Sequence, residues 1–72
     1  MPKLPIISGK KATKVFLQEG YVIDHQTGSH VILYKHNKIL TIPNHKELAR
    51  GTLRAIIKQA GLTREEFMKK LR

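Results

Sequence analysis

The four histidines are the residues of this chain best suited to acid–base chemistry, and the neighbours of His30 favour it as the reactive one. An imidazole gains and loses a proton near physiological pH, as a general acid or base must. His30 follows Gly28 and Ser29, and side chains this small would let a phosphate approach the ring closely. The Ser29 hydroxyl could hold that phosphate or orient the ring. Taken alone, the tripeptide is more typical of a plain hairpin turn with a bystander histidine.

Other reactive groups are few. The chain has no cysteine, which excludes disulfides, thiolate catalysis and cysteine-based zinc sites. Its five carboxylates are scattered along the sequence. The spacing of His25, His36 and His45 relative to His30 matches no helical metal-binding pair and no zinc finger. We therefore expect no metal and no small-molecule cofactor. His45, just after Pro43, is predicted either to carry a second proton or contact a phosphate, or merely to cap the turn that follows.

Positive charge dominates the composition. The chain has 14 Lys and Arg against 5 Asp and Glu, a formal net charge of +9. Such a field concentrates phosphate backbones at the surface and makes their binding depend steeply on salt, so the expected partner is a nucleic acid. No apolar stretch approaches the roughly 20 residues of a membrane span, and the start of the chain lacks the apolar region of a signal peptide. We expect a cytoplasmic protein that does not bind membranes.

One domain spanning residues 1–72 is predicted, beginning with a helix and three strands. Ser8 can cap a helix that continues to about Glu19 and ends at Gly20. Three β-rich segments then predict two hairpins in succession, with strands at 21–25, 30–35 and 38–42 and turns at 26–29 and 36–37. Pro43 is expected to end the third strand.

Two further helices complete the predicted chain. Thr52 can cap the first of them, which Gly61 ends, and Thr63 with Glu66 fits a capping box that begins a short C-terminal helix. Helices on one face of a three-stranded antiparallel sheet make an α+β sandwich of order α-β-β-β-α, whose other sheet face stays open.

The alternation of side chains along the second strand decides which residues reach the open face. We expect Val31 and Leu33 to face the core, and His30, Ile32 and Tyr34 to lie on the open face. Exposed aromatic residues for stacking on bases are few, which favours recognition through the phosphate backbone.

Basic residues near the second predicted helix are the expected phosphate contacts. The free N–H groups of residues 51–53 at its start form a ready anion site. Together with the glycine turn, the candidate substrate-binding residues are Gly28, Ser29, Lys35, His45, Lys46, Arg50, Arg54 and Lys58.

RNA is the polyanion that such a site could cleave without a metal. Its 2′-hydroxyl is the nucleophile, so an enzyme needs a base for that proton, an acid for the leaving 5′-oxygen and cations for the charged phosphorus. His30 is the candidate catalytic residue. Its acid partner stays open among Lys35, His45 and water.

Several short motifs follow one another along the chain in a fixed order. The sequence Gly28-Ser29-His30 precedes Pro43-x-His45-x-x-Leu48-x-x-Gly51-Thr52-Leu53-x-x-Ile56-x-x-x-Ala60-Gly61-Leu62. In this order and spacing, from about Ile6 to Phe67, the chain resembles the HicA-type mRNA interferase toxins. The resemblance implies a double-stranded-RNA-binding-like fold, ribonuclease action on mRNA with His30 as the catalytic histidine, and growth arrest. It also implies a HicB-type antitoxin that covers the active face.

Two other functions are compatible with parts of the sequence. A non-catalytic RNA-binding module of the same shape would use the basic surface without needing His30 at a glycine turn. A DNA-binding regulator would use residues 52–71 as a helix-turn-helix, but Ile57 stands where that motif usually has a small residue.

Overall fold

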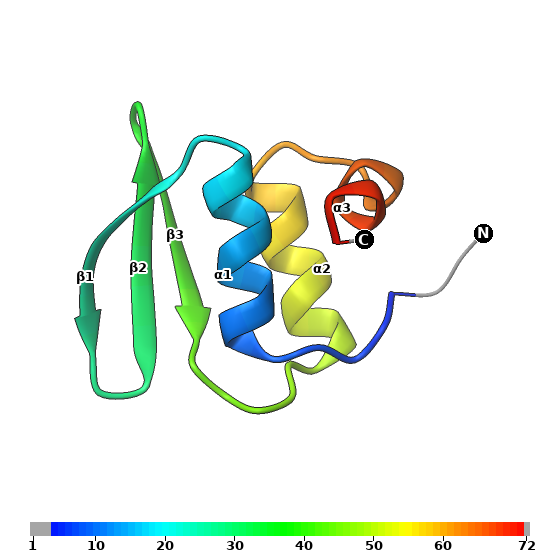
Figure 1. The fold of residues 1–72 in the computed structure, drawn as a ribbon, viewed down its shortest axis with the longest axis horizontal. Coiled ribbons are helices and arrows are strands. Elements are labelled where there is room, and N and C mark those ends of the chain that lie inside the picture. Colours follow the sequence, from blue (N-terminus) through cyan, green and yellow to red (C-terminus); the bar gives the residue numbers. More distant parts are fainter. Residues whose placement is uncertain (1–3, 72) are drawn as a thin grey trace.

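The computed structural model describes residues 4–71 and confirms the predicted α+β architecture. Figure 1 shows the sheet at one side of the molecule and the helices at the other. Along the chain the elements are α1 (Gly9–Gln18), β1 (Val22–Thr27), β2 (His30–Lys35), β3 (Lys38–Pro43), α2 (Arg50–Gln59) and α3 (Arg64–Leu71).

The three strands form an antiparallel meander in the order β1-β2-β3. β2 pairs with β3 along its whole length, from His30 opposite Pro43 to Lys35 opposite Lys38. The register of β1 against β2 shifts at Asp24, as at a β-bulge.

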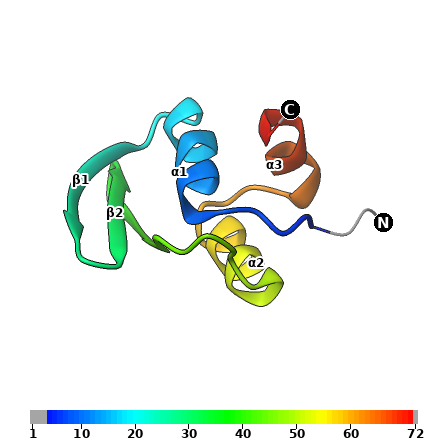
Figure 2. The same ribbon diagram turned by 60° about the horizontal axis from the view of Figure 1, so that its bottom comes forward.

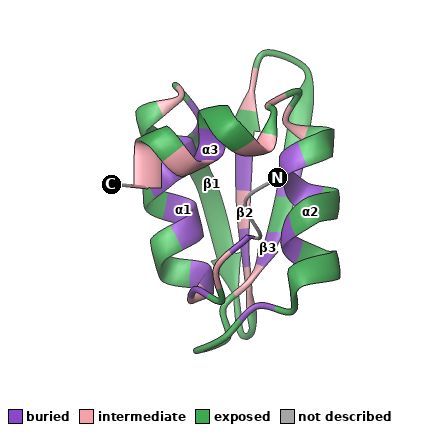
Figure 3. Ribbon diagram, turned by 90° about the vertical axis from the view of Figure 1, so that its right-hand side faces the viewer, coloured by how far each residue is buried: buried purple, intermediate pink, exposed green. Residues whose placement is uncertain are grey.

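The helices pack against one face of the sheet, mainly over β3, and leave β1 uncovered (Figure 2). Every residue of β1 is exposed, whereas Val31 and Leu33 of β2 are buried. His30 and Ile32 are half-buried and Tyr34 is exposed, so the predicted assignment of core face and open face is confirmed. The largest fully buried side chains come from the helices, from β2 and β3, and from the segment before α2 (Figure 3): Phe16, Phe67, Leu33, Leu40, Ile42, Leu48, Leu53 and Val15.

The predicted limits of the first strand are wrong by one residue at its start and two at its end. Gln26 and Thr27 continue the ladder opposite Val31 and His30, so only residues 28–29 make the turn. Tyr21 does not begin the strand because its N–H donates to the Phe16 carbonyl and its ring lies edge-on to the Phe16 ring, 5.9 Å between centroids.

The predicted cap of α2 is also wrong. Ala49 is the N-cap and has no side-chain hydrogen bond, whereas Thr52 lies within the first turn. The chain turns earlier than expected because Leu48 is buried and its N–H donates to the Ile7 carbonyl, 2.8 Å away. Since the Leu53 N–H donates to the Ala49 carbonyl, it is not free to bind an anion, and the predicted anion site does not include it.

Candidate active site

His30 begins β2 on the open face of the sheet, where its side chain is half-buried. Its Nδ1 lies 3.1 Å from the Ser29 hydroxyl, and no other side-chain hydrogen bond involves this ring within residues 4–71. Because the contact occupies Nδ1, Nε2 is the nitrogen left to exchange a proton with a bound molecule. This contact is compatible with the expectation that the Ser29 hydroxyl orients the ring, which stays a prediction.

The end of β3 and the start of α1 support the turn that holds His30. The Asn44 N–H donates to the Ser29 carbonyl at 2.7 Å, and the Gly9 N–H donates to the His45 carbonyl at 2.9 Å. A Cβ atom on Gly9 would lie only 2.0 Å from the Pro43 carbonyl oxygen, so the close approach of α1 requires glycine. In Figure 1 the turn, the end of β3 and the start of α1 all lie along the lower edge of the molecule.

The structure brings the backbone of His45 to this same edge, with an exposed side chain. Lys46 follows it in the exposed loop before α2. Gly28 lies in the turn itself, and a Cβ atom there would meet nothing within 4 Å, so the space beside His30 is open. These residues can meet one molecule bound at the edge.

Lys35, by contrast, is not near His30. It stands five residues along β2, about 16 Å away at the usual strand rise. Its ammonium group donates to the Glu19 carbonyl at 2.7 Å and lies 5.7 Å from the centroid of the Tyr21 ring. Burial, and secondarily the Glu19 carboxylate, raise the pKa of that tyrosine. The expectation that Lys35 is a candidate acid partner or phosphate contact at His30 is therefore corrected.

The arginines and lysine expected on α2 are not grouped around His30 either. Arg54 and Lys58 are exposed one turn apart, and Lys58 is in the last turn of the helix, at the end away from the site edge (Figure 1). The guanidinium of Arg50 donates from Nε to the Leu4 carbonyl at 2.8 Å and so fastens the segment before α1.

Sequence reasoning missed a second imidazole on the open face. His25 donates from Nδ1 to the Asp24 carboxylate at 2.7 Å, and both side chains are about half exposed, 55% and 54%. Thr27 is directly opposite His30, so His25 is the diagonal neighbour of His30 across the two strands, a position usually about 7–8 Å away. The sequence did hold a signal for this. In a strand that continues to residue 27, the side chains of residues 25 and 27 lie on the same face, but the predicted strand ended at residue 25.

A comparison with known families agrees with this geometry. A model of the family described as the HicA toxin of bacterial toxin–antitoxin systems matches residues 9–62, a range that includes the Ser29–His30 turn, the whole sheet and α2. The chain belongs to the HicA toxin family. No curated protein matches it. The resemblance inferred from the motifs is confirmed, and this HicA toxin has an antitoxin as its general class of partner.

The open sheet face of the HicA toxin carries no Lys or Arg among the described strands. From the register, its residues are Val22, His25, Thr27, His30, Ile32, Tyr34, Ile39, Thr41 and Pro43. Lys35 and Lys38 stand opposite each other in the ladder and alternate to the helix-covered face. The positive charge of Lys and Arg thus lies on the helices, in the loops and at the strand ends, and the open face carries only its histidines and the neighbouring Asp24 carboxylate as titratable acid–base groups among the described strands apart from Tyr34.

The end of the open face away from His30 is apolar. Val22, Tyr34 and Ile39 are 46%, 44% and 64% exposed in one row of the sheet. A shallow cavity of about 440 Å³ lies there, lined by Asp24, Ile32, Tyr34, His36, Asn37 and Ile39. An exposed apolar patch with a polar rim is typical of a surface that binds another molecule.

Two further features bear on the expected partners. Within residues 4–71 no three His, Cys, Asp or Glu side chains gather as a metal site would need. No helix in that range is long and apolar enough to span a membrane.

Proposed function

We propose that this HicA toxin is an mRNA interferase, a metal-independent endoribonuclease that acts in the cytoplasm with His30 as its catalytic residue. The observation that carries this proposal is the His30 imidazole at a glycine–serine turn. The Ser29 hydroxyl contacts its Nδ1, which leaves Nε2 for a proton transfer, and the turn is open at Gly28. Growth arrest would follow from the loss of intact mRNA.

The proposed reaction needs only the substrate's own nucleophile. The 2′-oxygen attacks the adjacent phosphorus and gives its proton to a base, while the bond from phosphorus to the 5′-oxygen breaks and that oxygen takes a proton from an acid. The products are a 2′,3′-cyclic phosphate and a free 5′-hydroxyl. His30 Nε2 carries one of these two protons, and the Ser29 contact holds the ring in place.

His25 is the best-supported carrier of the other proton. It lies on the same face as His30, and Asp24 accepts the hydrogen of its Nδ1, which leaves its Nε2 to give or take a proton. His45 and water remain alternatives, because the His45 backbone lies at the same edge. With two groups, one acts as the base while the other acts as the acid.

Cleavage of an mRNA transcript in excess chelator, by the parent, His30→Ala and His25→Ala proteins, tests the proposal. We expect the parent to leave 2′,3′-cyclic ends, His30→Ala to be at least about 100-fold slower, and His25→Ala to be slower by about tenfold or more. His36→Ala is the matched control, since His36 lies at the other end of β2 in the 36–37 turn.

Equal cleavage by the parent and His30→Ala would contradict the catalytic role. A parent that shifts RNA in a gel without cutting it between pH 5 and pH 9, with or without ribosomes, would favour the alternative of a non-catalytic RNA-binding module.

The proposed partner is a HicB-type antitoxin that covers the open face. Support comes from the exposed apolar row of Val22, Tyr34 and Ile39 and from the absence of Lys and Arg on that face in the described strands. A protein seated there would cover His30 as well, because both ends of the face belong to the same three strands.

A further inference from the structure

Three arginines surround one cavity on the side of the molecule away from the sheet. The cavity has a volume of about 220 Å³ and is lined by Leu4, Arg50, Arg54 and Arg64. Arg50 and Arg54 lie one turn apart on α2, and Arg64 is the half-buried first residue of α3. Figure 3 looks onto this side, where α3 and the start of the described chain lie in front of the sheet.

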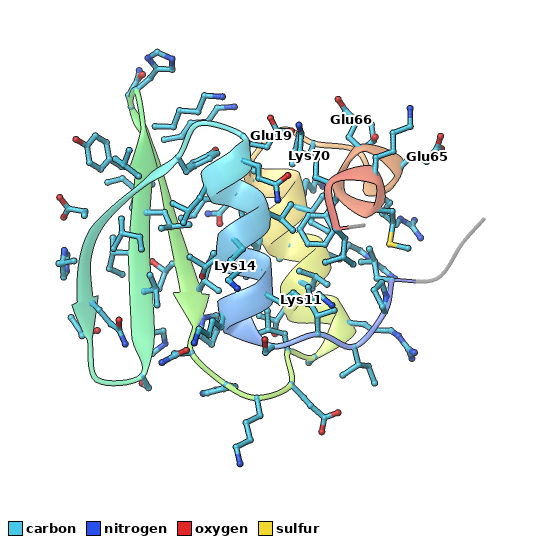
Figure 4. All side chains as sticks on the ribbon, viewed as in Figure 1. Lys11, Lys14, Glu19, Glu65, Glu66 and Lys70 are labelled. Atoms are coloured by element: carbon cyan, nitrogen blue, oxygen red, sulfur yellow. The ribbon has the colours of Figure 1, made fainter. Side chains whose placement is uncertain are left out.

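No carboxylate neutralises these arginines within residues 4–71. The ion pairs there join Asp24 to His25 and Glu19 to Lys70, and Glu66 accepts the Thr63 N–H instead. Figure 4 shows Glu19 and Lys70 together, and Glu66 in the first turn of α3. Like charges brought to one cavity without a counter-charge repel each other, so a bound anion would relieve a cost that the folded protein carries.

The chemistry of the cavity suits a phosphate group better than a metal cation or an apolar ligand. Guanidinium groups offer planar pairs of donors that match phosphate oxygens, and Leu4 gives the cavity an apolar side. Arg50 uses Nε on the Leu4 carbonyl, so its terminal nitrogens remain for an anion. The start of α2, where Ala49 offers no side-chain cap, adds a favourable dipole.

We propose that Arg50, Arg54 and Arg64 form a second phosphate site, which binds the backbone of RNA at a distance from His30. The inference rests on the proposed function only in taking RNA as the polyanion. Because the helices separate this cavity from the open sheet face, a partner seated on that face leaves it accessible. The site would anchor a part of the RNA that is not being cut.

Binding of an RNA that cannot be cleaved tests this site separately from catalysis. A short 2′-O-methyl RNA lacks the nucleophile, so its affinity for the protein can be measured by fluorescence anisotropy at several salt concentrations with His30 intact. We expect Arg64→Gln and Arg54→Gln each to weaken binding about tenfold at every RNA sequence and to lower the salt slope by about 1.

Lys69→Gln is the matched control, because it removes the same charge from an exposed position of α3 that does not line the cavity. We expect it to weaken binding about twofold or less. Arg64→Lys keeps the charge but loses the paired donors and should fall between the parent and Arg64→Gln. Thermal melting of each variant checks the fold. If Arg64→Gln is unstable, the Arg54→Gln variant still tests the site, because Arg54 is exposed.

The double variant distinguishes one site from a diffuse field. If Arg54 and Arg64 hold the same phosphate, the double loss is smaller than the product of the two single losses. The proposal would be overturned if the double variant lost affinity by the full product of the two single losses. It would also be overturned if Lys69→Gln and Arg64→Gln lost equal affinity. Both outcomes hold whether or not the protein cleaves RNA. A titration with inorganic phosphate, followed on the Arg54 and Arg64 side-chain NMR signals, forms a second arm. Signals that move with phosphate but not with RNA would overturn the assignment to the RNA backbone.

Discussion

At the scale of single residues, Gly9 decides how closely α1 approaches the edge that holds His30. A Cβ atom at Gly9 would meet the Pro43 carbonyl oxygen at 2.0 Å, and that oxygen belongs to backbone, which cannot swing aside. The consequence reaches the site because Pro43 pairs with His30 and Asn44 holds the Ser29 carbonyl. A small residue in α1 thus helps to fix the position of His30, the proposed catalytic residue.

Gly9→Ala is expected to destabilise the fold by about 2 kcal/mol or more, because helix and strand must separate to admit the methyl group. Gly51→Ala is the control, since a Cβ atom there meets nothing within 4 Å and alanine favours a helix by about 1 kcal/mol. Urea unfolding of both variants measures the difference. A Gly9→Ala protein as stable as the parent would contradict the close contact.

At the scale of elements, α3 begins with a capping box and packs through Phe67, its one fully buried residue among those described. The Thr63 N–H donates to the Glu66 carboxylate at 2.9 Å, and the Glu66 N–H donates to the Thr63 hydroxyl at 3.1 Å. The backbone hydrogen bond from Thr63, and secondarily its hydroxyl, hold the pKa of Glu66 below its ordinary value of 4.5.

A carboxyl group whose pKa is lower in the folded than in the unfolded state stabilises the fold above the unfolded pKa and loses that effect as the pH falls through the folded pKa. Glu66→Gln keeps a hydrogen-bond acceptor but removes the charge. The parent should therefore have a higher melting temperature than this variant at pH 7. This advantage should be lost as the pH is lowered from about 4.5 toward 3. Melting curves at several pH values measure it, and a constant difference across that range would contradict the ionised box.

At the scale of the whole molecule, charge and apolar surface are separated. The helices, the loops and the strand ends carry the Lys and Arg residues described, and the open sheet face carries apolar side chains around its histidines. A polyanion and a protein partner would therefore prefer different sides. His30 stands on the open face at the start of β2, which lies at the lower edge of the sheet in Figure 1.

Ile39→Lys should weaken binding of the cognate antitoxin by about tenfold or more, because it places a charge in an apolar interface. It should leave the fold intact, since Ile39 is 64% exposed. Ile6→Lys is the control, because Ile6 is 53% exposed but lies before α1, outside the sheet. Calorimetric titration with the antitoxin measures both, and equal affinities would place the interface elsewhere.

Local sequence determined the elements and the turn before His30, because caps and turns depend on neighbours in the chain. Ser8 accepts the Lys11 N–H as an N-cap should, Gly20 and Gly61 have the positive φ angles that end helices, and the capping box forms as predicted. The first turn of α2 was misjudged since Leu48 is pulled into the core by a distant partner, Ile7.

Only the tertiary structure decided which side chains meet. Strand register puts His25 beside His30, and a register is fixed by pairing between strands. Helix packing brings Arg64 to Arg50 and Arg54 across a gap in sequence that no local spacing reveals. The sequence by itself determined what each segment is and that its charge favours a polyanion, whereas long-range packing, which depends on the whole core at once, decided where the groups converge.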